Sequence, residues 1–382
     1  MTARRLRLLT TGRADWNILA PLARALHADL DFDLGLIVTG GHLDVDQGMT
    51  VRAVEATGQP IAARLSWGEG TPASRAARVL DGVAAVLTSD PPDMLILLGD
   101  RFETLAAAQG ASLVGVPIVH LSGGDVTEGA MDDAFRHAVS KLSHLHLAFH
   151  EPAARRLRQM GEAFDRVHVV GNPALDDLVE SARMPDAELE RRLDAPLGER
   201  NLLLTFHPVT LQPDRGRAEL EALLGALGRL DDSWTLWITA PNADPGGPDF
   251  DARLRAWSAL RPRAHFREAL GRAYAPLAAR CAAVIGNSSS GLAEVPTLGV
   301  PTIDVGDRQG GRLAGPSVFH AAASADAILA ALDRAFTFRP DGASNPYGDG
   351  RSVPRIISIL KSARPRDALL RKPFVDLEAG HG

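Results

Sequence analysis

The sequence predicts two doubly wound α/β domains, each a Rossmann-like parallel sheet with helices on both faces. Along most of the 382 residues, short apolar runs alternate with longer helical patterns, which is typical of βα units. The chain becomes charged between 181 and 200, where Pro185 and Pro196 act as breakers. A new apolar run at 202–206 then restarts the alternation. We therefore expect domains at 1–184 and 185–352.

The first half contains six apolar runs of strand length, separated by helical patterns. The predicted strands are 6–10, 34–38, 94–98, 117–121, 145–149 and 167–170. The predicted helices between them include 16–28, 73–87, 102–113 and 133–141. In the second half the predicted strands are 202–206, 235–239, 283–286 and 300–305. An amphipathic segment at 353–360 predicts a last helix, and we expect 353–372 to complete the N-terminal domain.

Composition excludes several classes of protein. The apolar fraction of 45% and the charged fraction of 23% are those of an ordinary soluble globular chain. A net charge of −6 argues against nucleic-acid binding, which needs clustered Lys and Arg. The single cysteine, Cys281, excludes an intrachain disulfide. Since no run reaches membrane-span length and the N-terminus lacks a signal peptide, we expect a cytoplasmic protein without a membrane partner.

A strand-to-helix turn in the last third is the most informative segment. The apolar run 282–286 ends in Asn287, and three serines (Ser288, Ser289 and Ser290) then open a helix that closes at Gly299. A helix N-terminus presents unpaired N–H groups and a partial positive charge to anions. The next strand delivers Arg308. Hydroxyls, helix N–H groups and an arginine together predict a site for a diphosphate.

Polar residues also follow the other strands, and ligands of parallel sheets bind at the carboxyl ends of the strands. Asp100 and Asp125 follow successive strands and could form a proton-transfer pair, although each could equally cap a helix or face solvent. Arg13 follows the first strand. His207 and Asn242 follow strands of the second half.

The helix after the Gly123-Gly124 loop contains two candidate ion pairs at i,i+4 spacing. These pairs are Asp132 with Arg136 and Asp133 with His137, which ordinary helix stabilisation also explains. Separately, His144 and His146 share one strand face and would suit a metal-dependent hydrolase. Since no third ligand is visible at convincing spacing, structural histidines are the favoured interpretation.

Collected in order, these residues resemble the sugar-nucleotide 2-epimerases, specifically the hydrolysing UDP-N-acetylglucosamine 2-epimerases of sialic-acid and legionaminic-acid biosynthesis. The resemblance runs from about Thr10 to Arg312. The stretches that carry it are TGRAD at 11–15, GDRFE at 99–103, GGDVTEG at 123–129, DDAFRH at 132–137, KLSHLH at 141–146, FHPVT at 206–210, PNADPGG at 241–247 and GNSSSG at 286–291.

The resemblance implies the glycosyltransferase-B architecture, with two Rossmann-like domains facing a cleft. It also implies elimination of UDP with loss of the C2 proton, followed by hydration of the 2-acetamidoglucal to release N-acetylmannosamine. No metal and no cofactor are implied, and we expect a homodimer or homotetramer. Catalytic positions are assigned to Asp100, Asp125, Asp133 and His207. Substrate and UDP positions are assigned to Arg13, Arg101, Asn242, Tyr274, Ser288, Ser289, Ser290, Glu294 and Arg308.

Two departures from the family pattern leave the substrate and the C2 base open. The residue after Gly-Gly is more often Glu, whereas this chain has the shorter Asp125, and Ser122 replaces a common His or Glu before it. The substrate could be UDP-GlcNAc or a 2,4-diacetamido analogue, and a GDP-linked sugar stays possible. The alternatives are a non-hydrolysing UDP-GlcNAc 2-epimerase and a non-catalytic sugar-nucleotide-binding protein. A glycosyltransferase is disfavoured because no acceptor site is evident.

Overall fold

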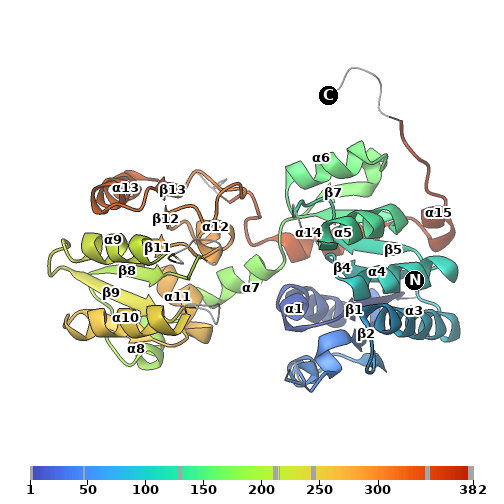
Figure 1. Cartoon of the computed structure of the whole chain (residues 1–382). Helices are drawn as coiled ribbons and strands as arrows, with labels where there is room; N and C mark the ends of the chain where they lie inside the picture. The colour runs from blue at the N-terminus through green and yellow to red at the C-terminus, as the bar shows by residue number, and fades with distance from the viewer. Residues whose placement is uncertain are drawn as a thin grey trace. The chain divides into compact units, whose positions relative to one another are not determined.

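The computed structural model describes residues 3–45, 48–127, 131–209, 214, 216–241, 247–339 and 345–376. The chain divides into two compact units. Unit 1 comprises Met1–Asp176 and Gly350–Gly382, and unit 2 comprises Asp177–Asp349. Each unit is a parallel sheet between layers of helices (Figure 1). None of the helices in the described ranges is both long enough and apolar enough to span a membrane.

Unit 1 is built on a seven-stranded parallel sheet in the order β3-β2-β1-β4-β5-β6-β7. Its strands are β1 (Arg4–Thr10), β2 (Phe32–Thr39), β3 (Ile61–Leu65), β4 (Met94–Leu98), β5 (Ile118–Leu121), β6 (Leu145–Ala148) and β7 (Val167–Val169). Its helices are α1 (Arg13–Ala28), α2 (Val51–Glu55), α3 (Pro72–Ser89), α4 (Phe102–Leu113), α5 (Met131–Leu142), α6 (Glu151–Gln159), α14 (Ser352–Ser362) and α15 (Arg366–Leu370), with 3-10 turns η1 (Gly40–Leu43) and η2 (Phe164–Arg166). Helix α7 (Ala174–Ser181) spans the boundary with unit 2.

The central strands of unit 1 are apolar on both faces because helices cover both faces. Strand β4 is buried at all of its residues. On one face, α1, α2, α14 and α15 pack against alternate residues of β1, β2 and β4. On the other face, α3 and α4 cover the intervening residues, and α5 adds Val139. The C-terminal helix α14 therefore belongs to the core of unit 1, where Ile356 and Leu360 are fully buried.

Unit 2 has a six-stranded parallel sheet in the order β10-β9-β8-β11-β12-β13. Its strands are β8 (Arg200–Thr205), β9 (Trp234–Thr239), β10 (Ala264–Arg267), β11 (Cys281–Gly286), β12 (Thr302–Val305) and β13 (Val318–Ala321). Its helices are α8 (Asp186–Leu193), α9 (Arg217–Leu227), α10 (Gly247–Ala259), α11 (Tyr274–Ala278), α12 (Ser290–Ala293) and α13 (Ala325–Thr337), with 3-10 turns η3 (Gly271–Ala273) and η4 (Val295–Leu298). Helices α9, α10 and α13 pack on one face of the sheet, whereas α8 and α11 pack on the other.

The close approach of β8 and β11 depends on a glycine at the end of β11. Gly286 has φ of +142°, and a Cβ added there would lie 1.9 Å from the backbone oxygen of Thr205 in β8. No residue with a side chain fits this position without moving one of the strands. The two strand ends, and the loops that follow them, are thereby held side by side.

Candidate active site

In unit 1, the acidic residue after β4 is paired with a buried arginine. Asp100 follows Gly99 at the end of the strand, and the guanidinium of Arg136 in α5 contacts its carboxylate. Arg136 is only 5% exposed. The sequence predicts that Arg136 pairs with Asp132 on the same helix, and this is wrong. Asp132 is exposed, whereas Arg136 points into unit 1 because Asp100 and Asp133 both accept from it.

Asp133 closes the loop that follows β5. Its Oδ1 accepts the backbone N–H of Thr127 at 2.7 Å and Nη1 of Arg136 at 3.3 Å. Its Oδ2 lies 3.6 Å from Nε2 of His137, so the second pair predicted from i,i+4 spacing is present. Nη2 of Arg136 donates to Oγ1 of Thr127 at 3.0 Å. Arg136 and Asp133 therefore tie Asp100 to the loop that also carries Asp125.

A buried histidine in β5 fixes the residue before Asp100. His120 is fully buried, and burial lowers its pKa to about 3, so the ring is neutral at physiological pH. Its Nε2 lies 2.8 Å from the carbonyl oxygen of Gly99. Since a carbonyl only accepts, Nε2 must carry the proton and donate it. His120 thus holds the end of β4 from the neighbouring strand.

The loop 122–125 after β5 is tightly constrained. Ser122 has φ of +62°, the left-handed region that non-glycine residues rarely occupy. Asp125 is held by His150, whose Nε2 lies 2.6 Å from Oδ1 of the carboxylate. His150 does not appear among the predicted site residues. Its position directly after the predicted strand 145–149 could have identified it. Asp100 and Asp125 were selected because they follow the carboxyl ends of parallel strands, and His150 does so too.

The two predicted substrate arginines of unit 1 differ in their surroundings. Arg13 is the first residue of α1 and is exposed. Arg101 is the N-cap of α4, and its Nη2 donates to Oε1 of Glu103 at 3.0 Å. The Glu103 side chain is completely buried. Glu103 therefore anchors the guanidinium of Arg101, whereas Arg13 is presented to solvent.

In unit 2, Asn287 joins the loops after β8, β11 and β12. Its Oδ1 accepts the backbone N–H of His207 at 2.7 Å, and its Nδ2 donates to the carbonyl of His207 at 2.8 Å. Its backbone oxygen accepts from Nη1 of Arg308 at 3.0 Å and from Nε2 of Gln309 at 2.8 Å. The predicted residues His207 and Arg308 are therefore brought to one turn by an asparagine that is fully buried.

The serines after Asn287 begin a helix that is shorter than the sequence predicts. Helix α12 comprises Ser290–Ala293 and gives way to the 3-10 turn η4 before Gly299. The physical reason is Pro296, which cannot donate the backbone hydrogen bond that a continuing helix needs. Ser289 is the N-cap, and the hydroxyls of Ser288 and Ser290 lie 3.1 Å apart. The hydroxyls of Ser288 and Ser290 thus lie together at this turn, whereas the N–H groups of Gly291 and Leu292 already donate to the carbonyls of Ser288 and Ser289, each at 3.1 Å.

Tyr274 and Glu294 lie near each other in unit 2, and both are partly buried. Burial raises the pKa of the Tyr274 phenol, and the nearby Glu294 carboxylate raises it further. Burial also raises the pKa of Glu294. The other predicted ligand residue, Asn242, and its neighbour Asp244 lie outside the described residues.

The histidines considered for a metal site are engaged elsewhere. Nε2 of His146 lies 2.9 Å from Oε2 of the buried Glu162, and Nδ1 of His144 accepts the backbone N–H of Ile118 at 3.1 Å. Within the ranges that the structure describes, no group of three or more His, Cys, Asp or Glu has the arrangement of a metal site. These contacts favour the interpretation of both residues as structural histidines.

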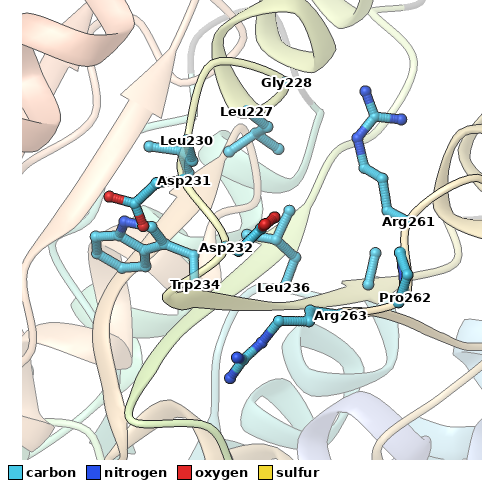
Figure 2. A pocket seen from close by; sticks show the side chains of 11 residues that line it. Leu227, Gly228, Leu230, Asp231, Asp232, Trp234, Leu236, Arg261, Pro262 and Arg263 are labelled. Atoms are coloured by element: carbon cyan, nitrogen blue, oxygen red, sulfur yellow. The ribbon is translucent and has the colours of Figure 1, made fainter.

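A pocket of about 410 Å³ in unit 2 lies away from these residues. Figure 2 shows Trp234, Asp231, Arg261 and Arg263 around it. Trp234 begins strand β9, so the pocket sits at the amino ends of the strands. The Asn287 turn and the predicted ligand residues follow the carboxyl ends, and we therefore do not assign the pocket to the candidate site.

Comparison with known proteins gives full-length relatives. Residues 24–361 match the family described as UDP-N-acetylglucosamine 2-epimerase. The hydrolysing GDP/UDP-N,N'-diacetylbacillosamine 2-epimerase of Campylobacter jejuni is 33% identical, covering 88% of this chain and 87% of that protein. The hydrolysing UDP-N,N'-diacetylbacillosamine 2-epimerase of Legionella pneumophila is 31% identical, covering 97% and 98%.

Solved structures show the same fold. The UDP-GlcNAc 2-epimerase of Neisseria meningitidis, crystallised with UDP-GlcNAc, superposes with a TM-score of 0.78 at 18% identity, covering 94% of this chain and 100% of that chain. The enzyme of Methanocaldococcus jannaschii gives 0.77 at 19% identity, with the same coverage. Together with the two parallel sheets, these likenesses confirm the predicted class, two Rossmann-like units of the glycosyltransferase-B type. The chain belongs to the UDP-N-acetylglucosamine 2-epimerase family of enzymes.

Proposed function

We propose that this chain is a hydrolysing nucleotide-sugar 2-epimerase, which converts a UDP-linked 2-acetamido sugar and water into UDP and the free sugar inverted at C2. The candidate substrates are UDP-GlcNAc and its 2,4-diacetamido analogue. The names of the Campylobacter and Legionella relatives support the diacetamido sugar. They also support the hydrolysing reaction over one that returns a UDP-linked product.

The observation that carries the proposal is the pair of carboxylates after neighbouring strands. Strands β4 and β5 are paired with Leu98 opposite Leu121, and Asp100 and Asp125 follow these two residues within four positions. Asp100 is held by Arg136, whereas Asp125 is held by His150. Two differently held carboxylates suit a reaction in which one group removes a proton and another returns it.

The chemistry balances without an oxidant, a reductant or a metal. A carboxylate takes the C2 proton, the C1–O bond to UDP breaks, and the C1–C2 double bond of a 2-acetamidoglucal forms. The electron pair of the broken bond leaves with UDP. Water then adds its hydroxyl to C1, and a proton returns to C2 from the opposite face. We assign removal of the C2 proton to Asp125, whose loop is held by Asp133. We assign the return of a proton to C2 to Asp100.

Unit 2 would bind the leaving group. Ser288, Ser289 and Ser290 offer hydroxyls, and Arg308 offers a guanidinium beside Asn287. Such donors stabilise the negative charge that develops on a departing diphosphate. Glu294 would then accept from the ribose hydroxyls, and Tyr274 would lie against the uracil. His207, locked to Asn287 through its backbone, would approach the same phosphates.

The test is incubation of the pure protein in D₂O with UDP-GlcNAc and, separately, with the UDP-linked 2,4-diacetamido sugar. We expect release of UDP together with a free C2-epimeric sugar that carries deuterium at C2. Release of UDP without deuterium would overturn the elimination step. A UDP-linked epimer as the product would identify the non-hydrolysing reaction, and binding without turnover would identify a sensor.

The setting of the enzyme is part of the proposal. A nucleotide-sugar substrate supports a cytoplasmic location, where no membrane or nucleic-acid partner is expected. We further propose a homodimer or homotetramer, which light scattering of the purified chain tests directly. GDP-linked sugars belong in the substrate screen because the Campylobacter relative is named for both nucleotides.

A further inference from the structure

His150 contacts the proposed C2 base but has no role in the site as predicted from the sequence. It lies between β6 and α6, and its side chain is only 7% exposed. Nε2 of its ring lies 2.6 Å from Oδ1 of Asp125, whose carboxylate is 31% exposed. One oxygen of a partly open carboxylate is thus held by a group from the protein interior.

The backbone determines which ring nitrogen of His150 carries the proton. His150 is the N-cap of α6, and its Nδ1 accepts the backbone N–H of Ala153 at 3.2 Å. A nitrogen that accepts a hydrogen bond is unprotonated, so the proton of the neutral ring is on Nε2. Nε2 therefore donates to Asp125, and the direction of this bond is set by a helix cap that is independent of any substrate.

The loop of Asp125 and the first turn of α6 also pack directly against each other. Gly124 has φ of +82°, and a Cβ added there would lie 2.2 Å from the backbone oxygen of Ala153. Nη1 of Arg156 donates to the carbonyl of Gly124 at 2.9 Å. These contacts fix the backbone of Gly124, the residue before Asp125. The backbone of Asp125 is therefore held close to His150.

The two oxygens of Asp125 consequently have different surroundings. Oδ1 accepts the short bond from His150, whereas Oδ2 has the Ser122 hydroxyl at 3.5 Å, the outer limit for a hydrogen bond. A carboxylate that removes a proton needs one oxygen with a free lone pair aimed at the C–H bond. Oδ2 is the oxygen in that condition.

We propose that His150 is a positioning residue that binds Oδ1 of Asp125 and thereby directs Oδ2 toward the C2 proton of the nucleotide sugar. The inference rests on the proposed function. In the step concerned, the C2–H bond breaks, the proton moves to Oδ2, the C1–C2 double bond forms, and UDP leaves with the electron pair of the C1–O bond. His150 keeps its own proton throughout and does not touch the sugar.

The decisive variant is His150→Asn. Asparagine is a good N-cap, so α6 keeps its cap, but its side chain is too short to replace Nε2 at Asp125. We expect kcat to fall on the order of 100-fold, because misplacing a reacting group by about 1 Å has such an effect, while KM changes by less than about threefold. His168→Asn, a half-buried histidine in β7 of the same unit, is the matched control and should leave kcat unchanged.

A kinetic isotope effect separates positioning from a structural role. With substrate deuterated at C2, His150→Asn should raise the isotope effect on kcat/KM, because proton removal becomes more strongly rate-limiting. A variant that merely lost folded protein would lower kcat with the isotope effect unchanged, and that result would overturn the proposal. His150→Gln, whose amide N–H reaches as far as Nε2, should recover part of the lost rate.

A double-mutant cycle tests whether His150 acts through Asp125. In the Asp125→Asn background, adding His150→Asn should cost no further activity, whereas independent roles would multiply the two losses. An inactive wild-type chain would overturn the proposed function and this inference with it. An active wild type whose His150→Asn variant keeps its kcat and isotope effect would overturn this inference alone.

Discussion

The guanidinium of Arg136, in the middle of helix α5, contacts the carboxylate of Asp100 just beyond strand β4. The same guanidinium donates to Asp133 and to Thr127. One buried cation therefore joins a strand end, a helix and the loop after the next strand. When Asp100 is substituted, Arg136 still donates to Asp133 and Thr127. We therefore expect that Asp100 can be substituted without loss of the fold.

Asp100→Asn should therefore retain UDP binding but lose turnover. The amide cannot exchange a proton, so we expect kcat for UDP release to fall by about 100-fold or more. The dissociation constant of UDP, measured by calorimetry, should stay within about twofold of the wild-type value, because the residues proposed to bind the diphosphate belong to unit 2. Asp132→Asn, at an exposed position in α5, is the control and should behave as wild type. Unchanged turnover in Asp100→Asn would remove this residue from the mechanism.

The sequence predicted the central strands well and the edge strands poorly. The apolar runs coincide with the strands inside each sheet, because a strand covered on both faces must be apolar throughout. Strands β3, β10 and β13, three of the four edge strands, were not predicted, whereas the fourth, β7, was. An edge strand has one neighbour and is partly exposed, as the alternating burial of β3 shows. Its composition therefore carries less signal.

The site was predictable to the extent that it follows strand ends. That rule selected Asp100, Asp125, His207 and Arg308 from position alone. It did not reveal that Arg136 turns inward, because helical periodicity relates residues only within one helix. Pairings between separate elements, such as His150 with Asp125, arise from tertiary packing and have no counterpart in local sequence.

Glu162 should control the lower part of the acid-unfolding curve. Burial alone would raise the pKa of this carboxyl, but hydrogen bonds from His146, Lys141 and Lys372 outweigh it and hold the pKa at about 2. The unfolded value is near 4.5, so the stabilisation is complete above pH 4.5 and is lost as the pH falls toward 2. Glu162→Gln should flatten this part of the curve.

At neutral pH, Glu162→Gln should lower the free energy of unfolding by about 3 kcal/mol, since two lysines lose a buried counter-ion. Denaturant unfolding at pH 7 and pH 3 measures both effects. Glu151→Gln removes an exposed partner of Arg158 and should cost less than about 1 kcal/mol. An equally steep acid limb in Glu162→Gln and wild type would show that other carboxyls dominate.

His120 and His144 should control the upper part of the same curve. Burial lowers the pKa of His120 to about 3 and that of His144 to about 4, against 6.5 for an exposed histidine. Since the unfolded chain binds these protons first, stability is complete above pH 6.5 and declines as the pH falls toward 3. His120→Gln can keep the hydrogen bond to Gly99 but does not titrate.

We therefore expect His120→Gln to reduce the slope of stability against pH between 6.5 and 3. The slope that remains comes from His144, from Glu162 below pH 4.5 and from other buried histidines whose pKa is lowered, such as His146. The measurement is the midpoint of urea unfolding at half-unit pH intervals. The exposed His27→Gln is the control and should reproduce the wild-type slope. A slope in His120→Gln that matches the wild type would mean that His120 is protonated in the folded protein.

Asn287→Asp should separate the diphosphate turn from the loop of His207. The carboxylate can still accept the His207 N–H, but it cannot donate to the His207 carbonyl, which then faces a second acceptor. The position is fully buried, so the new charge also lacks solvent.

We expect UDP affinity to fall at least about tenfold, equivalent to about 1.4 kcal/mol, and the melting temperature to fall by several degrees. The matched control is Asn172→Asp, because Oδ1 of Asn172 accepts the backbone N–H of Ala174, a bond that aspartate reproduces. Calorimetric titration with UDP and thermal unfolding measure the two effects. Undiminished UDP affinity in Asn287→Asp would mean that the turn binds no diphosphate.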